Sequence, residues 1–188
     1  MRSVPLLVLF ASLVAAGCDS GSQGPPRSAR ILEVAVTDAP LVDPSNGQDW
    51  DGDIGGGPEV YFRLFDADVD VVADPGADRL NPRDDAEVFA VDSAEPWYED
   101  VRDSTFPLFW DVEPGYVVRD LEDELVVALF DYDPFGDDDP MAVSEVFRMG
   151  DVAPSQVDGR VDTITLRGVD LDGRDADVGV RLTVLFDD

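Results

Sequence analysis

The sequence predicts an all-β fold of the sandwich or barrel type, and three observations support this prediction. Short blocks rich in β-branched residues alternate apolar and polar positions, which is the period of a half-buried strand. Clusters of Gly, Pro, Asn and Asp separate these blocks, as turns do. No stretch longer than a turn or two has helical periodicity. The 188 residues are enough for about one such domain.

Nine blocks along the chain are candidate strands. They are Ile31–Thr37, Glu59–Phe65, Glu87–Val91, Trp97–Val101, Leu108–Val112, Glu124–Phe130, Ala142–Phe147, Thr163–Arg167 and Val178–Phe186. Residues Gly150–Gln156 are typical of one short helical turn. The segment Asp66–Asp85 is long, acidic and rich in turn residues, so we expect an exposed excursion between two strands.

The charge of the chain excludes several classes of function. It carries 42 acidic and 13 basic residues for a formal net charge of -29, every basic residue is Arg, and there is no His. Such a field repels nucleic acid and anionic membranes, so we expect no nucleic-acid partner. Without His or Lys, the usual catalytic triads, Schiff bases and zinc sites are excluded, and we expect no enzyme. A carboxylate-only mechanism remains possible in any acidic chain and carries little weight.

The N-terminus has the features of a targeting segment. Arg2 precedes the apolar stretch Val4–Ala16, which is short for a membrane span. The only cysteine, Cys18, follows Ala15-Ala16-Gly17. This arrangement resembles a bacterial lipoprotein signal, in which that cysteine is lipidated. A general secretory signal cleaved near Gly17 is the alternative.

The resemblance to a lipoprotein divides the chain into three parts. Residues 1–17 would be the signal peptide, residues 18–29 the lipidated cysteine with a flexible tether, and residues 30–188 the folded domain. The tether assignment also rests on its Gly, Ser, Gln and Pro content. We therefore expect a protein of the cell envelope, periplasmic or surface-exposed, that is attached to the membrane through an N-terminal lipid.

The most acidic loop follows a strongly apolar strand. The run Leu125–Phe130 leads into Asp131–Asp139, which holds five carboxylates in nine residues. Calcium takes six to eight oxygen ligands on flexible backbone, so a loop of this kind can bind it. The competing explanation is general acidity, because a high-salt environment screens such repulsion and tolerates an acidic surface.

The order of motifs along the chain resembles the C2 domain, a β-sandwich family that binds calcium at one end. Asp131, Asp133 and Asp139 have the spacing of its third-loop aspartates, with an aromatic residue between the first two. Residues Ser104–Trp110 and Gly57–Phe62 resemble two further segments of that family. The second of these departs from the pattern, because Glu59 stands where Asp is usual.

The resemblance implies a fold, a ligand set and a cofactor. The fold would be an eight-stranded antiparallel Greek-key sandwich in the second, circularly permuted connectivity, since a strong block ends the chain and none precedes Ile31. The cofactor would be Ca²⁺. The implied ligands are Asp43, Glu59, Asp131, Asp133 and Asp139, with Asp38, Asp49, Asp51 and Asp53 as alternatives to Asp43 in a long first loop.

The resemblance also implies possible partners. Phe135 would lie at the tip of the third loop, where membrane-docking members of the family place an apolar residue. The bound calcium could then bridge to a phospholipid or to a protein partner. The expected function is thus a calcium-binding interaction module, and the alternative is a calcium-independent structural or adhesion sandwich. Asp137 and Asp138 are interpreted as solvated neighbours of the site.

Overall fold

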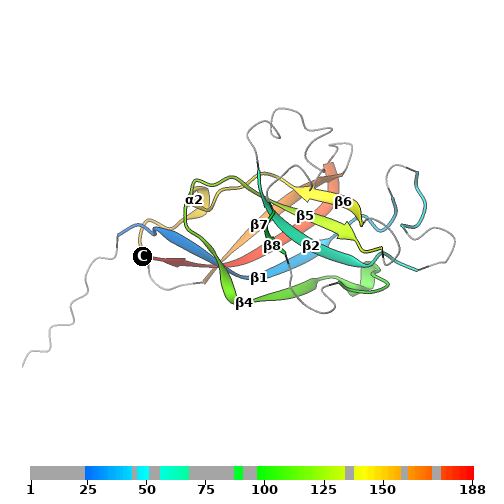
Figure 1. Ribbon diagram of the computed structural model, residues 1–188, viewed down its shortest axis with the longest axis horizontal. Coiled ribbons are helices and arrows are strands. Elements are labelled where there is room, and N and C mark those ends of the chain that lie inside the picture. The colour runs from blue at the N-terminus through cyan, green and yellow to red at the C-terminus, as the bar shows by residue number, and fades with distance from the viewer. Residues whose placement is uncertain are drawn as a thin grey trace, which may run out of the picture.

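The computed structural model describes residues 24–43, 46–50, 56–67, 87–90, 97–133, 138–157, 161–170 and 175–188. Eight antiparallel strands and almost no helix make up these ranges, which confirms the all-β prediction (Figure 1). The strands are β1 Ser28–Asp38, β2 Val60–Asp66, β3 Glu87–Ala90, β4 Leu108–Val118, β5 Leu125–Asp131, β6 Asp139–Ser144, β7 Val161–Asp170 and β8 Asp175–Asp187. One 3-10 turn, Asp103–Thr105, and the short helix α2, Met149–Val152, complete them.

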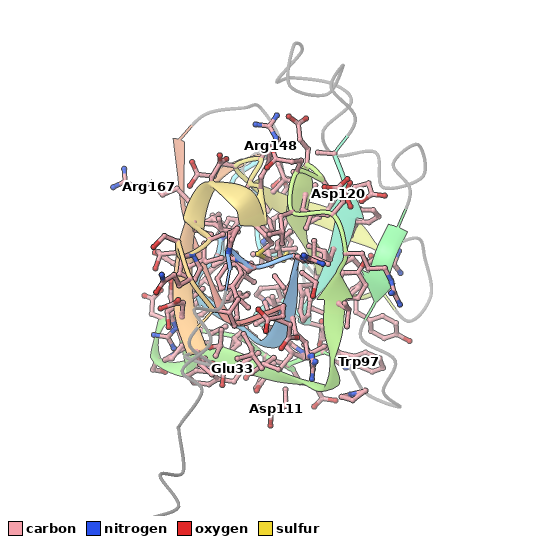
Figure 2. All side chains as sticks on the ribbon, turned by 90° about the vertical axis from the view of Figure 1, so that its left-hand side faces the viewer. Glu33, Trp97, Asp111, Asp120, Arg148 and Arg167 are labelled. Atoms are coloured by element: carbon pink, nitrogen blue, oxygen red, sulfur yellow. The ribbon has the colours of Figure 1, made fainter. Side chains whose placement is uncertain are left out.

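Hydrogen bonds join all eight strands into one sheet in the order β3-β2-β5-β6-β7-β8-β1-β4. The sheet curls over on itself, so that side chains from both of its halves fill one interior (Figure 2). This interior holds alternate residues of β1, β2, β4, β5, β7 and β8, among them Val34, Phe62, Trp110, Leu129 and Leu182. The curl buries these apolar faces without a second layer of helices.

Strand β5 is buried on both faces, as its continuous apolar sequence requires. Leu125, Val127 and Leu129 point into the main core. Val126, Ala128 and Phe130 belong to a second apolar cluster, which also contains Tyr61 and Phe65 of β2 and Val143 of β6. We call this second cluster the outer cluster, and it covers the opposite face of β2, β5 and β6.

Both described ends of the chain lie at one end of the strands, beside α2 (Figure 1). The amide of Arg27 donates a hydrogen bond of 3.0 Å to the carbonyl of Asp187, and β1 pairs with β8 from Ser28↔Asp187 onward. Strand β1 therefore begins two residues before Arg30, the expected start of the domain. Residues 1–23, including the predicted signal peptide and Cys18, lie outside the described residues.

Three expected elements differ from the structure. The block expected at Ala142–Phe147 forms β6 instead, which begins at Asp139 and ends at Ser144. Residues Trp97–Val101 form no strand, and only Tyr98 pairs, through an isolated bridge to Val60. Strand β4 continues past Val112 to Val118, because the sheet absorbs Pro114-Gly115 as an irregularity in its pairing with β1. Gly115 has a φ of 101°, a conformation that glycine adopts without steric cost. The expected helical turn is present as α2, and most of Asp66–Asp85 lies outside the described residues.

Tyr98 connects the two halves of the curled sheet. Its backbone exchanges hydrogen bonds of 2.9 and 3.0 Å with Val60 at the start of β2. Its phenol group donates to the carbonyl of Phe109 in β4 at 2.7 Å and accepts from the amide of Phe109 at 3.2 Å. The ring also packs edge-on against Trp110, with centroids 5.1 Å apart. Tyr98 therefore joins β2, through its backbone, to β4, through its side chain.

We predict that Tyr98→Phe lowers the free energy of unfolding by about 1–2 kcal/mol, because the ring contact with Trp110 remains while the hydrogen bonds to Phe109 are lost. Chemical denaturation monitored by tryptophan fluorescence measures this change. An unchanged unfolding midpoint would show that the hydroxyl does not stabilise the contact between β2 and β4.

Candidate carboxylate site

The predicted ligands gather at the end of the strands opposite to the chain ends. Strand β5 ends at Asp131 and β6 begins at Asp139, and these two residues are partners in the antiparallel register. On the other side of β5, Asp131 pairs with Val60, directly after Glu59. The backbone therefore holds Glu59, Asp131 and Asp139 side by side.

Asp131 is buried, with 1% of its surface exposed, and its position is fixed by the backbone of the neighbouring segment. Its Oδ1 accepts a hydrogen bond of 2.7 Å from the amide of Glu59. The carbonyl of Glu59 in turn accepts from the amide of Tyr132 at 2.9 Å. A buried carboxylate is costly unless it is hydrogen-bonded, so this contact stabilises the junction between the β2 entry and the β5 exit. The sequence did not indicate this structural role.

A second contact holds the chain just before Glu59. The amide of Gly57 donates to Oδ1 of Asp100 at 2.8 Å, and the amide of Val101 donates to the carbonyl of Pro58 at 3.1 Å. The hydrogen bond from Gly57 and the ion pair with Arg102 lower the pKa of the exposed Asp100 carboxyl. A Cβ at Gly57 would lie 2.0 Å from the carbonyl oxygen of Val101, so the close approach requires glycine.

Asp138 is engaged by its surroundings rather than solvated as the sequence suggested. Its Oδ1 accepts a hydrogen bond of 3.2 Å from the amide of Asp133, and its Oδ2 accepts one from the hydroxyl of Tyr61. The guanidinium of Arg63 lies 4.0 Å from the same Oδ2. Asp138 thus links the end of the acidic loop to β2. The period-2 alternation places Tyr61 and Arg63 on one face, but the sequence gives no signal for their contact with Asp138.

Asp139 receives the negative field of three other carboxylates. Partial burial raises the pKa of Asp139 above its ordinary value of 3.8, and the charges of Asp133, Asp43 and Asp138 raise it further. Two of these three neighbours belong to the same acidic loop, and Asp43 comes from the loop after β1. The charges of Asp43 and Asp133 therefore both act on Asp139, and a shared metal site of these three residues stays a prediction. Glu59 is not among the charges that shift the pKa of Asp139.

Asp43 lies in a compact turn. Its carbonyl accepts from the amide of Gly47 at 2.7 Å, and its amide donates to the carbonyl of Gln48 at 2.8 Å. The side-chain amide of Asn46 donates to the carboxylate of Asp43. The indole of Trp50 donates to the carbonyl of Pro40 at 2.8 Å and closes this part of the loop. Among the alternative ligands, Asp38 and Asp49 are exposed, and Asp51 and Asp53 lie outside the described residues.

The described carboxylates act on one another electrostatically, but they do not form a coordination shell for a metal ion. Within the described ranges, no three acidic side chains are placed so that they could hold a metal ion together. Phe135 and Asp137 belong to residues 134–137, outside the part of the chain that the structure describes. In their observed positions, the side chains of Asp131 and Asp138 are hydrogen-bonded to protein groups. A cation bound here would therefore require some of these side chains to turn.

Trp97 and Tyr132 form an aromatic pair beside the carboxylates. Their rings stack with centroids 3.9 Å apart and planes 10° from parallel. Tyr132 lies between Asp131 and Asp133 in sequence, so the stack fixes one part of the acidic loop against the segment that precedes Tyr98. The aromatic residue between the two aspartates therefore has a packing role. Phe109, in contrast, is 43% exposed on β4.

We predict that Asp139→Asn raises the melting temperature at pH 7 by about 1–3 °C when a chelator is present. Because the folded-state pKa of Asp139 is raised, its ionised form costs stability once the pH rises above the ordinary value of 3.8. The gain in melting temperature should shrink on acidification. It should vanish near pH 3, where the carboxyl of Asp139 is protonated in both the folded and the unfolded protein. Thermal scans between pH 3 and pH 7 at low ionic strength measure it.

The matched control for this prediction is Asp151→Asn, which removes one exposed carboxylate from α2 at the opposite end of the strands. Its effect on the melting temperature should be smaller at pH 7. An Asp139→Asn protein that is less stable than the wild type at neutral pH would contradict the repulsion inferred at this end.

Comparisons with known proteins give no family to this chain. No family model matches the sequence, and a search of curated proteins finds no match. No helix in the described ranges has the length and apolar character needed to cross a membrane.

Proposed function

We propose that this chain is a lipid-anchored protein of the bacterial cell envelope whose C2-like domain binds calcium through its acidic loops and acts as an interaction module. The observation that carries the proposal is the convergence of charge on Asp139 from Asp133, Asp138 and Asp43. These carboxylates come from two separate loops at one end of the sheet. A divalent cation would relieve their mutual repulsion.

The C2-like assignment rests on the order of motifs and agrees with an eight-stranded antiparallel architecture. The last strand, β8, pairs along its length with β1, which is compatible with the circularly permuted connectivity. The eight strands are joined in one curled sheet, and a Greek-key sandwich of two sheets is the finer form that we propose for it. The family resemblance implies calcium, for which carboxylate oxygens on irregular backbone are the preferred ligands.

The proposed ligand set is Asp43, Glu59, Asp131, Asp133 and Asp139. Asp133 and Asp139 flank the acidic loop, and the charge of Asp43 acts on Asp139 from the loop after β1. Asp131 ends β5 beside Asp139, and Glu59 precedes β2 on the other side of Asp131. The five side chains do not form a coordination shell in their observed positions. Calcium binding would therefore have to move the two loops that carry them closer together. The binding free energy then appears as folded-state stability.

The partner of the bound ion would be a phosphate group of a phospholipid or an acidic group of a protein, which calcium can bridge to the carboxylates. Phe135 is the residue we propose for apolar contact with lipid. The net charge of -29 opposes docking on an anionic membrane and disfavours nucleic acid. A protein partner at the cell envelope is therefore the favoured occupant, and no enzymatic reaction is proposed.

The second candidate is a calcium-independent structural or adhesion domain whose acidity reflects a high-salt environment. The carboxylates then repel one another only weakly, because a high salt concentration screens exposed charges. The response to salt and to specific ions separates the two functions.

We predict that calcium raises the melting temperature by roughly 5–10 °C when its concentration is about one hundred times the dissociation constant. Magnesium at the same ionic strength should raise it much less, because it demands stricter geometry and dehydrates reluctantly. Differential scanning calorimetry in calcium, magnesium and chelator measures the difference. Equal melting temperatures in all three at high ionic strength would favour the calcium-independent function.

The variant for this test is the double substitution Asp133→Asn with Asp139→Asn, which should abolish the rise in melting temperature that calcium causes. Asp131→Asn is a poorer choice, because Asp131 is buried and its Oδ1 supports the amide of Glu59. The matched control is again Asp151→Asn at the opposite end, which should keep the full response to calcium.

We predict that Cys18→Ser abolishes incorporation of labelled palmitate and releases the protein from the membrane fraction of bacterial cells that express it. The cysteine would be the acylated residue, and a serine cannot take its place in a thioether. Membrane fractionation with and without the substitution measures the effect. A wild-type chain that incorporates no label would point to the general secretory signal instead.

A further inference from the structure

Strand β7 is paired on both sides only at its C-terminal end. On one side, β8 pairs with it from Val161 to Val169. On the other side, β6 leaves it after the pair Ser144↔Gly168. The chain that follows β6 turns to β5 instead, where Phe147 and Leu125 exchange two hydrogen bonds of 2.9 Å. Among the described residues, the first half of β7 therefore has a strand on one side only.

Arg167 shows which backbone groups of β7 point away from β8. Its carbonyl accepts a hydrogen bond of 2.7 Å from the amide of Glu145, and its own amide donates to Oε1 of Glu145 at 3.1 Å. Backbone groups alternate along an antiparallel strand, so those of Thr165, Thr163 and Val161 point to the same side. No described segment forms a backbone hydrogen bond with them there. We call these three positions the free edge.

The free edge has the character of a strand that can accept another strand. Val161 is 47% exposed, and Thr163 and Thr165 are also exposed. Ile164 and Leu166 alternate with them and hold β7 in the main core. The pairing with β8 is regular throughout this part. The free edge contains no Pro, no charge and no bulge, which are the features that natural edge strands use against pairing with another chain.

The two outermost strands of the sheet are protected in these ways. At β4, the hydroxyl of Tyr98 donates to the carbonyl of Phe109 and accepts from its amide, so that these two edge groups are occupied. Further along β4, Pro114 interrupts the edge beside the irregular pairing with β1. Strand β3 is only four residues long. In the described part of the fold, β7 thus offers the more open edge.

We propose that the free edge of β7 is an interaction surface for a second copy of this chain, which adds its own β7 in antiparallel orientation. One register alone pairs all three free positions with free positions. It places Thr163 opposite Thr163 of the second copy, and Val161 opposite Thr165. A shift toward Arg167 would bring backbone groups that Glu145 already engages into the new ladder. The pairing forms about six hydrogen bonds around a two-fold axis. It goes beyond the proposed function and does not involve calcium.

The distribution of charge favours a second copy at this place. The outer face of β7 and β8 beside the free edge holds Arg167, Arg181, Thr183 and Leu185 and no carboxylate. Figure 2 shows the side chain of Arg167 pointing away from the body of the domain. Two acidic chains can therefore meet here without bringing carboxylates of these faces together. The facing Thr and Val side chains form cross-strand pairs that stabilise a ladder.

Salt should strengthen this association. Each copy has a formal net charge of -29, so two copies repel each other over longer distances. The Debye length falls from about 10 Å to about 3 Å between 0.1 M and 1 M salt, which screens this repulsion. Because two short edges bury little surface, we expect a weak dimer whose population rises with protein and salt concentration.

The first experiment is disulfide trapping in the full chain. Cys18→Ser removes the only cysteine, and Thr163→Cys is added to it. In the proposed register the two Cα atoms of residue 163 lie about 5.5 Å apart, which a disulfide can bridge. Oxidation with copper phenanthroline should give a cross-linked dimer on a non-reducing gel, in higher yield at high salt.

Thr165→Cys in the same background is the matched control. Its two Cα atoms would lie about 14 Å apart in the proposed register, which is too far for a disulfide. It should stay monomeric under the same oxidation. Equal cross-linking of both variants would show random collision, and no cross-linking of Thr163→Cys at high salt would show that the edges do not meet. Either result would overturn the proposal.

The second experiment needs no cysteine. Sedimentation equilibrium of the full chain at about 0.5 M salt measures the dimer directly. Thr163→Lys should weaken it about fivefold, because it places two like charges opposite each other at the two-fold axis. Val117→Lys adds the same charge on β4, where Val117 is 38% exposed, and should associate at least as well as the wild type.

The sign of the effect separates the free edge from net charge. Both lysine substitutions lower the net negative charge, so a general charge effect would strengthen association in both. Equal association of the two variants, or a wild type that stays monomeric, would overturn the proposal. The calcium response of the melting temperature is a separate measurement, so either result leaves the proposed function standing.

Discussion

The burial of β5 on both of its faces is the constraint on which the rest of the structure depends. Its first six residues supply alternate side chains to the main core and to the outer cluster, so the strand can only lie between two apolar layers. Strands β2 and β6 must then flank it, and the chain must leave the apolar environment abruptly at Asp131. That exit explains why a buried carboxylate is tolerated there. The amide of Glu59, just before the neighbouring strand β2, donates a hydrogen bond to Oδ1 of this carboxylate.

The acidity of the chain has a different meaning at different positions. At Asp139, partial burial raises the pKa of the carboxyl, and the charges of Asp133, Asp43 and Asp138 raise it further. At Asp138 the same kind of charge is balanced by the guanidinium of Arg63, which contacts the rings of Tyr61 and Phe130, and by the hydroxyl of Tyr61. At Asp100, a hydrogen bond to Gly57 and an ion pair with Arg102 make the ionised form favourable. Among the 42 acidic residues, the surroundings therefore favour the ionised form at some positions and disfavour it at others. The net charge alone does not describe these differences.

The parts of the fold that depend on local pattern could be predicted from the sequence. The apolar run that becomes β5, the alternating strands β1 and β8, and the position of the acidic loop after Phe130 are all visible in the residue order. The engagement of Asp138 and the structural role of Asp131 could not be predicted, because both depend on cross-strand register. An irregularity between Leu129 and Phe130 shifts the pairing of β5 with β6, and no local pattern reports such a shift. The segment around Tyr98 was misassigned as a strand for a related reason. Its apolar residues serve a contact between β2 and β4 that lies outside any ladder.

The pairing of Arg27 with Asp187 has a consequence for how the molecule faces its surroundings. It fixes the point where the chain enters the domain at one end of β1, while the carboxylates lie beyond the other end. An eleven-residue strand spans about 35 Å, so the two ends are separated by most of the length of the domain. Anything attached through the N-terminus would therefore meet the domain at the end that is farthest from its carboxylates, and the carboxylates would stay accessible to a second partner.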